Sequence, residues 1–398
     1  MKKREYRVAI AAMLIAGYAA NAGAVEIKDV LEEINSNNLT LRAAAQNNSA
    51  DNLELRSDNT LPATAIEYSP FFRSGVTGLA SSELIVRQDF DFPTLYHSRS
   101  KAADTQQVAL EKGLDAERAE LLTQARIKCL ELIYNRHTSE ILSQRKAAGD
   151  SLLALYEEKL RLRSATILEL NKIKLEQSEI EREIAENDMA ATLLIQELTA
   201  LNGGKALDLA GLEYDVESRS VILPESIDGL MAVNPGIGAA EAGVKSAEAE
   251  VSLGKQSWVP TLSVGYRRNT EGTEASNGFL VGAEFPLFSI GKKSKAASAR
   301  LAAARLTLES TLMDEKTRLD SELERLHTLQ KSIATYDTPL INETLNLYKE
   351  SLQAGGLSLS DYYTETSFLY DRLQTRARLE NEFQTLLASF YKGKEYGK

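Results

Sequence analysis

The sequence has little of the chemistry that enzymes and metalloproteins use. Its 398 residues include one cysteine, Cys129, and only three histidines, His97, His137 and His327, which lie far apart. A single cysteine excludes an intramolecular disulfide, and the histidines lack the spacing of metal ligands. The formal net charge of -11 argues against a nucleic-acid-binding surface. We therefore expect no catalytic residue, no metal site, no cofactor and no nucleic-acid partner.

The N-terminal apolar run, residues 8–20, is too short to cross the roughly 30 Å of hydrocarbon in a bilayer. Four basic residues precede this run, and small residues follow it at Ala22-Gly23-Ala24. This pattern is typical of a bacterial export signal, which predicts a signal peptide over residues 1–24 and cleavage before Val25. Because no cysteine lies near the cut, we expect no lipid anchor on the mature N-terminus.

Proline is scarce as well, with eight in the whole chain, and one stretch of about 60 residues contains only Pro339. Within residues 293–354 an apolar residue recurs every seven positions, which predicts a long helix in a coiled coil. Pro339 removes a backbone donor and should kink this helix or divide it in two. The heptad positions are Leu312, Leu319, Leu326, Ile333, Leu340 and Leu347.

The chain is a duplication. Phe92-Pro93 reappears as Phe285-Pro286 at an offset of 193 residues, and Leu155-Tyr156 reappears as Leu347-Tyr348 at an offset of 192. Each half reads as a short helical segment (27–59 and 227–257), two strands, a long outgoing helix and a returning helix. The predicted organisation begins with a signal peptide, 1–24, and a first repeat, 25–201, which has strands in about 62–92 and a helical hairpin at 98–201. A link, 202–224, leads to a second repeat, 225–392, which has strands in about 259–288 and a hairpin at 293–392. A tail, 393–398, follows.

Each strand pair alternates, with apolar and aromatic side chains on one face and charge on the other. Strands of about ten residues with polar, glycine-containing turns, here at 73–82 and 269–277, are typical of transmembrane strands, although an ordinary hairpin half covered by protein gives the same pattern. Four strands cannot close a barrel, so other copies of the chain would have to complete it. Gln88 falls on the face predicted to contact lipid. The face predicted to line a lumen carries Glu67, Arg87, Asp89, Asp91, Arg267 and Glu284.

In this order of elements the chain resembles the TolC family of bacterial outer-membrane channels. The residues that carry the resemblance are Asn234-Pro235, Val259-Pro260-Thr261-Leu262, Phe285-Pro286-Leu287-Phe288, and Pro339 followed by Leu345-Asn346-Leu347-Tyr348 and a Gly355-Gly356-Leu357-Ser358-Leu359-Ser360-Asp361-Tyr362 segment.

The resemblance implies a mainly helical fold with a small transmembrane β part. It implies a homotrimer with a 12-stranded barrel in the outer membrane of a Gram-negative bacterium and a 12-helix periplasmic tunnel. The family is not enzymatic. Its tunnel meets a periplasmic adaptor (a membrane fusion protein), which couples it to an inner-membrane pump.

The resemblance also places the adaptor-docking tips of the tunnel at two turns. These are Arg163-Ser164-Ala165-Thr166 and Gly355-Gly356-Leu357-Ser358. Acidic rings near the tips of family members are associated with cation binding and closure, which makes Glu169, Asp361 and Glu365 candidate gate residues; as an alternative they are solvated charges on a helix face. The first tip departs from the family, because Arg163 and Ser164 stand where glycine is frequent.

The interpretation is a passive exit duct of a tripartite efflux system for small molecules or ions. An exit channel of a type I protein secretion system has the same fold, and the sequence of the tunnel does not separate the two. A second alternative is a periplasmic coiled-coil adaptor without a barrel. Such adaptors normally have one helical hairpin, whereas this sequence predicts two. The absence of methionine and histidine clusters gives no support for copper or silver as the cargo.

Overall fold

The computed structural model describes residues 25–75, 77–215, 221–256, 258–286 and 291–396. The predicted signal peptide, and Leu287 and Phe288 of the resemblance motif, lie outside the described residues. The chain is mainly helical with one four-stranded sheet, which confirms the predicted fold class. Within the described part of the chain, no helix combines the length and apolarity needed to cross a membrane.

The chain forms two compact units, and each unit takes residues from both repeats of the sequence. Among the described residues, the first comprises 25–39, 120–215, 221–225 and 319–392, and the second comprises 40–75, 77–119, 226–256, 258–286, 291–318 and 393–396. The long helices α4 (Pro93–Arg161) and α9 (Lys292–Ile333) supply residues to both units. A compact unit therefore does not correspond to one sequence repeat.

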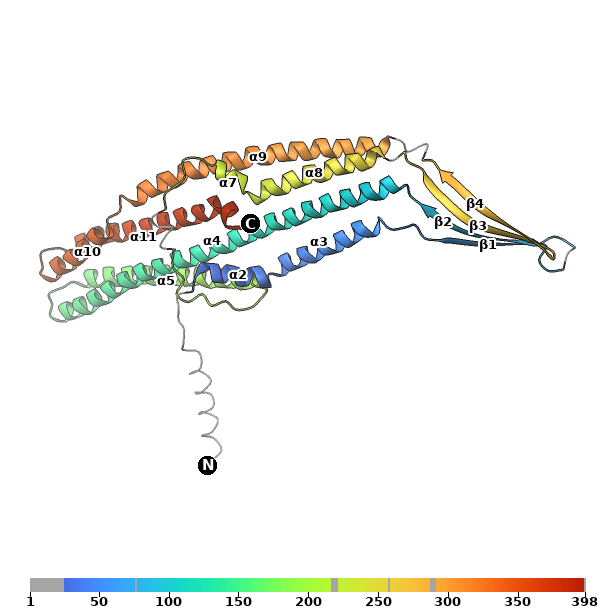
Figure 1. Cartoon of the computed structure of the whole chain (residues 1–398). Coiled ribbons are helices and arrows are strands. Elements are labelled where there is room, and N and C mark those ends of the chain that lie inside the picture. The colour runs from blue at the N-terminus through green and yellow to red at the C-terminus, as the bar shows by residue number, and fades with distance from the viewer. Residues whose placement is uncertain (1–24, 76, 216–220, 257, 287–290, 397–398) are drawn as a thin grey trace, which may run out of the picture. The chain divides into compact units, whose positions relative to one another are not determined.

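The first unit contains two helical hairpins (Figure 1). One is made by α4 and α5 (Ile167–Leu201), and the other by α10 (Thr338–Gln353) and α11 (Leu359–Phe390). Helix α2 (Ile27–Asn37) belongs to this unit, and α12 (Lys392–Tyr396) follows α11. Residues 334–337 are not helical, so the long rod is divided in two just before Pro339, as the sequence predicted. Asp337 caps the second piece, because its side chain accepts a hydrogen bond from the Leu340 backbone N–H at 3.0 Å.

The predicted seam from 312 to 347 is not continuous. Leu319 and Leu326 are buried, with 1% and 0% of their surface exposed, whereas Leu340 and Leu347 are exposed at 58% and 57%. The four non-helical residues before α10 change the phase of the heptad repeat, and Ile341 takes the buried position instead. The second half of the predicted seam therefore forms a separate, exposed apolar stripe.

In the second unit, α3 (Leu39–Ser57), α7 (Asp228–Ala232) and α8 (Pro235–Lys255) precede the strand pairs. Asn234 is the N-cap of α8, since its side-chain oxygen accepts hydrogen bonds from the backbone N–H groups of Gly236 and Ile237 at 2.9 and 3.2 Å. Pro235 then occupies the first helical turn, where its missing donor costs nothing. The predicted helix start at Asn234-Pro235 is confirmed.

The sheet is antiparallel with strand order β1-β2-β3-β4 (Figure 1). Its strands are β1 (Ala65–Phe71), β2 (Ser81–Phe90), β3 (Thr261–Glu271) and β4 (Glu274–Glu284). The two hairpins join through β2 and β3, which pair over ten residues. The prediction of a turn over 269–277 is wrong. Polar residues of this range belong to β3 and β4 and pair with each other, as Asn269 does with Ser276. Only Gly272, with φ +58°, and Thr273 form the turn.

Gln88 is accounted for by the start of β1. Its amide NH₂ donates to the Pro62 carbonyl oxygen at 2.7 Å, and its carbonyl oxygen accepts from the Thr64 hydroxyl at 2.5 Å. Both partners belong to the segment that leads into β1, whose first paired residue is Ala65. The Gln88 side chain therefore forms hydrogen bonds with the residues just before β1. Its polar atoms on this face already have partners within the chain.

We predict that Gly265 cannot carry a side chain without loss of stability. A Cβ atom there would lie 2.7 Å from the Val86 carbonyl oxygen on the neighbouring strand, and Gly278 on the same face has nothing within 4 Å. Gly265→Ala should lower the stability of the detergent-purified protein by about 1–3 kcal/mol, while Gly278→Ala should leave it nearly unchanged. Thermal unfolding measures both; equal midpoints for the two variants would contradict the close approach.

Candidate functional site

Both predicted tip turns have the same backbone hydrogen bonds. In the first, the N–H of Ser164 donates to the Lys159 oxygen at 2.8 Å and the N–H of Arg163 donates to the Leu160 oxygen at 2.9 Å. In the second, the N–H groups of Gly356 and Gly355 bond in the same way to Ser351 and Leu352, at 2.9 and 3.2 Å. These paired bonds define a Schellman motif, which ends a helix with one residue in the left-handed conformation.

The residue in the left-handed conformation differs between the tips. Gly355 has φ +76°, which glycine adopts freely. The equivalent residue of the first tip, Arg163, has φ +59° and is the only described non-glycine residue with positive φ. A side chain in this conformation costs about 1–2 kcal/mol. The first tip thus adopts the glycine-type turn with arginine in the glycine position.

Two of the candidate gate carboxylates cap the helices that follow the tips. The Thr166 hydroxyl accepts from the Glu169 N–H at 3.2 Å, and the Glu169 carboxylate accepts from the Thr166 N–H and hydroxyl at 2.7 and 2.8 Å. Ser358 and Asp361 form the corresponding contacts at the start of α11, at 3.1 and 2.6 Å. The backbone N–H of Thr166, and next its hydroxyl, lower the pKa of Glu169, so this carboxylate stays ionised at neutral pH.

Glu365, the third candidate, lies one turn further along α11. Its carboxylate accepts a hydrogen bond from the Tyr348 hydroxyl of α10 at 3.4 Å. Asp361 and Glu365 are exposed, and Glu169 is half-buried. The structure therefore places the three carboxylates in the first turns after the tips, and gives each of them a local partner in its own hairpin.

An apolar cluster beneath the tips joins the two hairpins. Lys172 of α5 also reaches across to α11, because its ammonium nitrogen lies 3.0 Å from the Ser360 hydroxyl and 5.9 Å from the ring centroid of Tyr363. Apolar packing and this polar link therefore hold both tips on one rigid end. The buried residues of the cluster are Leu152, Tyr156, Leu170, Ile173, Leu352, Leu359 and Tyr362.

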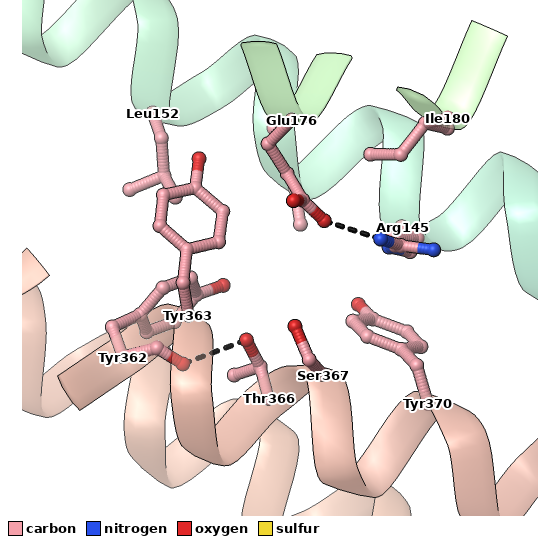
Figure 2. A pocket seen from close by; sticks show the side chains of 11 residues that line it. Arg145, Leu152, Glu176, Ile180, Tyr362, Tyr363, Thr366, Ser367 and Tyr370 are labelled. Atoms are coloured by element: carbon pink, nitrogen blue, oxygen red, sulfur yellow. Dashed lines mark hydrogen bonds and ion pairs between the residues drawn. The ribbon is translucent and has the colours of Figure 1, made fainter. Parts of the chain in front are cut away.

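A charged cluster lies further from the tips, between the same helices (Figure 2). Arg145 of α4 contacts Glu176, and it donates to both carboxylate oxygens of Glu183 at 3.1 and 3.2 Å. Figure 2 shows Tyr363 and Tyr370 of α11 pointing toward Arg145 and Glu176. The cavity between them has a volume of about 10 Å³, close to that of one water molecule. Because Arg145 is largely buried, removing either acid would leave a poorly compensated charge.

The tyrosines around this cluster are protonated. Burial raises the pKa of Tyr362 to about 12, and burial with the nearby Glu176 carboxylate raises the pKa of Tyr363 further. The Tyr363 hydroxyl is buried and has no hydrogen-bond partner among the described residues. Sequence reasoning missed Arg145, Glu176 and Tyr363. The one signal was Arg145 itself, a charged residue between the apolar residues Ile141 and Ala148, which are seven positions apart.

The residues predicted to line a lumen, apart from Asp91, share one face of the sheet in the second unit. Arg267 forms an ion pair with Glu83, which the sequence analysis did not single out, and Arg87 lies 3.3 Å from Asp89. The register puts Glu67 and Glu284 on this same face.

Asp91 lies elsewhere. Strand β2 ends at Phe90 and α4 begins at Pro93, so Asp91 is part of the connection between them. Its carboxylate accepts from Arg99 Nη1 at 2.7 Å and from the Thr261 hydroxyl at 3.1 Å. Asp91 therefore fixes the join between β2 and α4.

The side chains at these places offer no covalent chemistry. Cys129 is buried, and burial raises the pKa of its thiol to about 12, which makes it inert as the sequence analysis interpreted it. Within the part of the chain that the structure describes, no three His, Cys, Asp or Glu side chains are placed to hold a metal ion.

Comparisons with known proteins give one consistent result. Residues 227–392 match the family described as outer membrane efflux protein. The fold is similar to that of CusC, whose crystal structures concern transmembrane channel formation (19% identity, TM-score 0.76, 95% of each chain covered). It is also similar to the outer membrane protein VceC of Vibrio cholerae (16%, 0.75, 92% of this chain and 95% of that chain) and the outer-membrane channel CmeC of Campylobacter jejuni (14%, 0.73, 93% and 86%). No curated protein matches the sequence.

Replacing Arg163 by glycine should stabilise the first tip. Glycine removes the strain of a left-handed side chain, and the expected gain is about 1 kcal/mol. Hydrogen exchange of the backbone amides of residues 160–166 should slow about fivefold, while Gly355→Ala should speed exchange at the second tip. Faster exchange in Arg163→Gly would show that the arginine side chain stabilises the turn more than its conformation costs.

Proposed function

We propose that this chain, whose residues 227–392 match the outer membrane efflux protein family, is the passive exit duct of a tripartite efflux system. It is an outer-membrane channel that extends into the periplasm, and the family is one of transport proteins and not of enzymes. In the proposed system, small molecules or ions pass from an inner-membrane pump and a periplasmic adaptor into the duct. A periplasmic adaptor without a barrel does not fit two helical hairpins and a four-stranded sheet.

The proposal that the duct is a homotrimer rests on the open edges of the sheet. Among the residues that the structure describes, strands β1 and β4 each pair with only one other strand. In lipid, every unpaired backbone N–H or C=O at such an edge costs several kcal/mol, and bacterial single-chain barrels begin at eight strands. Three copies of four strands make twelve, and pairing β4 of one copy with β1 of the next removes both edges.

Exposed apolar stripes on the helices support the same assembly. On α5, Leu168, Leu175 and Met189 are exposed at 76%, 73% and 60%, and their spacing by multiples of seven puts them on one face. On α10, Leu340 and Leu347 form a second stripe of the same kind. Seams of this type bury against a partner helix in a coiled coil. We infer that a neighbouring copy covers each stripe and continues the wall of helices.

The tips are the surface proposed to dock the adaptor. Arg163, Gly355 and Gly356 are exposed, and the two tips share one backbone geometry, so a trimer would present six similar turns. Three copies each of Glu169, Asp361 and Glu365 would bring like charges together near these turns. The like charges within such a ring repel one another unless cations offset them. The proposed gate is therefore expected to bind cations.

A bulky side chain at the second tip should separate docking from folding. The Cβ position of Gly356 meets only Ser351, so Gly356→Trp should leave membrane insertion and trimer formation intact. We expect efflux in cells to fall at least tenfold, because the tip can no longer fit the adaptor. Gly229→Trp is the control, because Gly229 in α7 is exposed, has nothing within 4 Å of its Cβ position and does not have a positive φ. Normal efflux by a Gly356→Trp trimer would remove this turn from the docking surface.

The gate proposal predicts a specific electrical behaviour. Multivalent cations added on the periplasmic side should block single-channel current, and Asp361→Asn with Glu365→Gln should raise the half-blocking concentration about tenfold. Adaptor binding should be unchanged, because both replacements keep the shape of the side chain. An unaltered block in the double variant would leave these carboxylates as helix caps and surface charge only.

A further inference from the structure

Two adjacent arginines of β3 point to opposite faces of the sheet. Arg267 lies on the charged face and forms an ion pair with Glu83. Arg268 lies on the opposite face, where Leu84 and Asn277 are its neighbours on β2 and β4. Among the described residues, Arg268 has no hydrogen bond or ion pair. It is an exposed cation on a face whose other side chains are mainly apolar and aromatic.

The position of Arg268 along the strand sets its depth. One row closer to the helices, the same face consists of Ile66, Val86, Tyr266 and Phe279. Arg268 is in the next row, together with Tyr68, and four residues before Gly272 in the turn. With about 3.3 Å per residue and the tilt of barrel strands, it lies about 10 Å from the turn. A tyrosine beside the apolar band marks the level of lipid headgroups.

Asn277 adds a second donor at the same level. The Tyr266 hydroxyl donates to the Asn277 side-chain oxygen at 2.6 Å, which uses the amide oxygen and leaves the NH₂ group to donate. The Arg268 guanidinium has five N–H donors and no acceptor. The two side chains are directly opposite each other in the ladder, so the pair offers donors and positive charge without a carboxylate.

We propose that Arg268 and Asn277 bind the phosphate group of a lipid in the outer leaflet. Arginine suits phosphate because its planar N–H fork matches two phosphate oxygens. A guanidinium on a lipid-facing surface is costly unless its charge reaches the headgroups, and headgroup phosphate supplies the missing partner. The inference rests on the membrane placement of the sheet, and it assigns to this face a lipid-binding role in addition to conduction.

The test uses the purified trimer in neutral detergent and a bis-phosphorylated lipid A as the probe. Native mass spectrometry counts bound lipid, and a titration gives its Kd. Arg268→Gln should raise the Kd at least tenfold, Arg268→Lys should raise it less, and Asn277→Ala should raise it a few-fold. The matched control is Arg267→Gln, which removes the same charge one residue away on the other face and should leave the Kd unchanged.

Several outcomes would overturn the proposal. They are an unchanged Kd in Arg268→Gln, an equal loss in Arg267→Gln, and equal binding of a dephosphorylated lipid A. Displacement of the lipid by an equal concentration of inorganic phosphate would also overturn it, because the site would then recognise the free ion. Trimer formation and single-channel conductance are recorded in the same preparations, so loss of lipid binding in an intact, conducting trimer is distinguishable from failure of the channel itself.

Discussion

Unpaired backbone groups at the edges of a four-stranded sheet are the constraint on which the rest of this protein depends. A sheet that cannot close by itself is stable in lipid only when other strands pair with β1 and β4. The helices also need partners, because their apolar stripes at Leu168 and Leu175, and at Leu340 and Leu347, are exposed in one chain. Both parts of the fold are therefore incomplete in one chain, and the proposed assembly of identical copies would complete both.

The duplication shows which features of the tips the fold requires. The two turns share their hydrogen bonds and their helix caps, with Thr166 and Glu169 in one and Ser358 and Asp361 in the other. They do not share the residue in the left-handed position, since Arg163 stands where the second half has Gly355. Backbone hydrogen bonding thus determines the geometry, and a strained side chain is tolerated because two bonds and a cap hold the turn in place.

Periodicity in the sequence was enough to predict the helices, the strands and the faces of the sheet. It failed where the outcome depended on a partner distant in sequence. Polar residues near Asn269 read as a turn, yet cross-strand pairing extends β3 and β4 through them. The seam was assumed to continue through Pro339, whereas the break changes its phase. The cluster of Arg145, Glu176 and Tyr363 depends on three helices, and no local pattern encodes which residues will meet.

The placement of charge follows a simple division. Two arginines are paired with carboxylates within the chain, Arg145 of the helical unit with Glu183 and Arg267 of the charged sheet face with Glu83. The carboxylates of Glu169 and Asp361, next to the tips, accept hydrogen bonds from the neutral groups of Thr166 and Ser358, which leave the negative charge in place. An ion pair neutralises the charge that a ligand would bind, whereas a helix cap leaves the charge of the carboxylate in place. The residues proposed to bind cations at the tips, Glu169 and Asp361, are therefore also residues that cap the start of a helix.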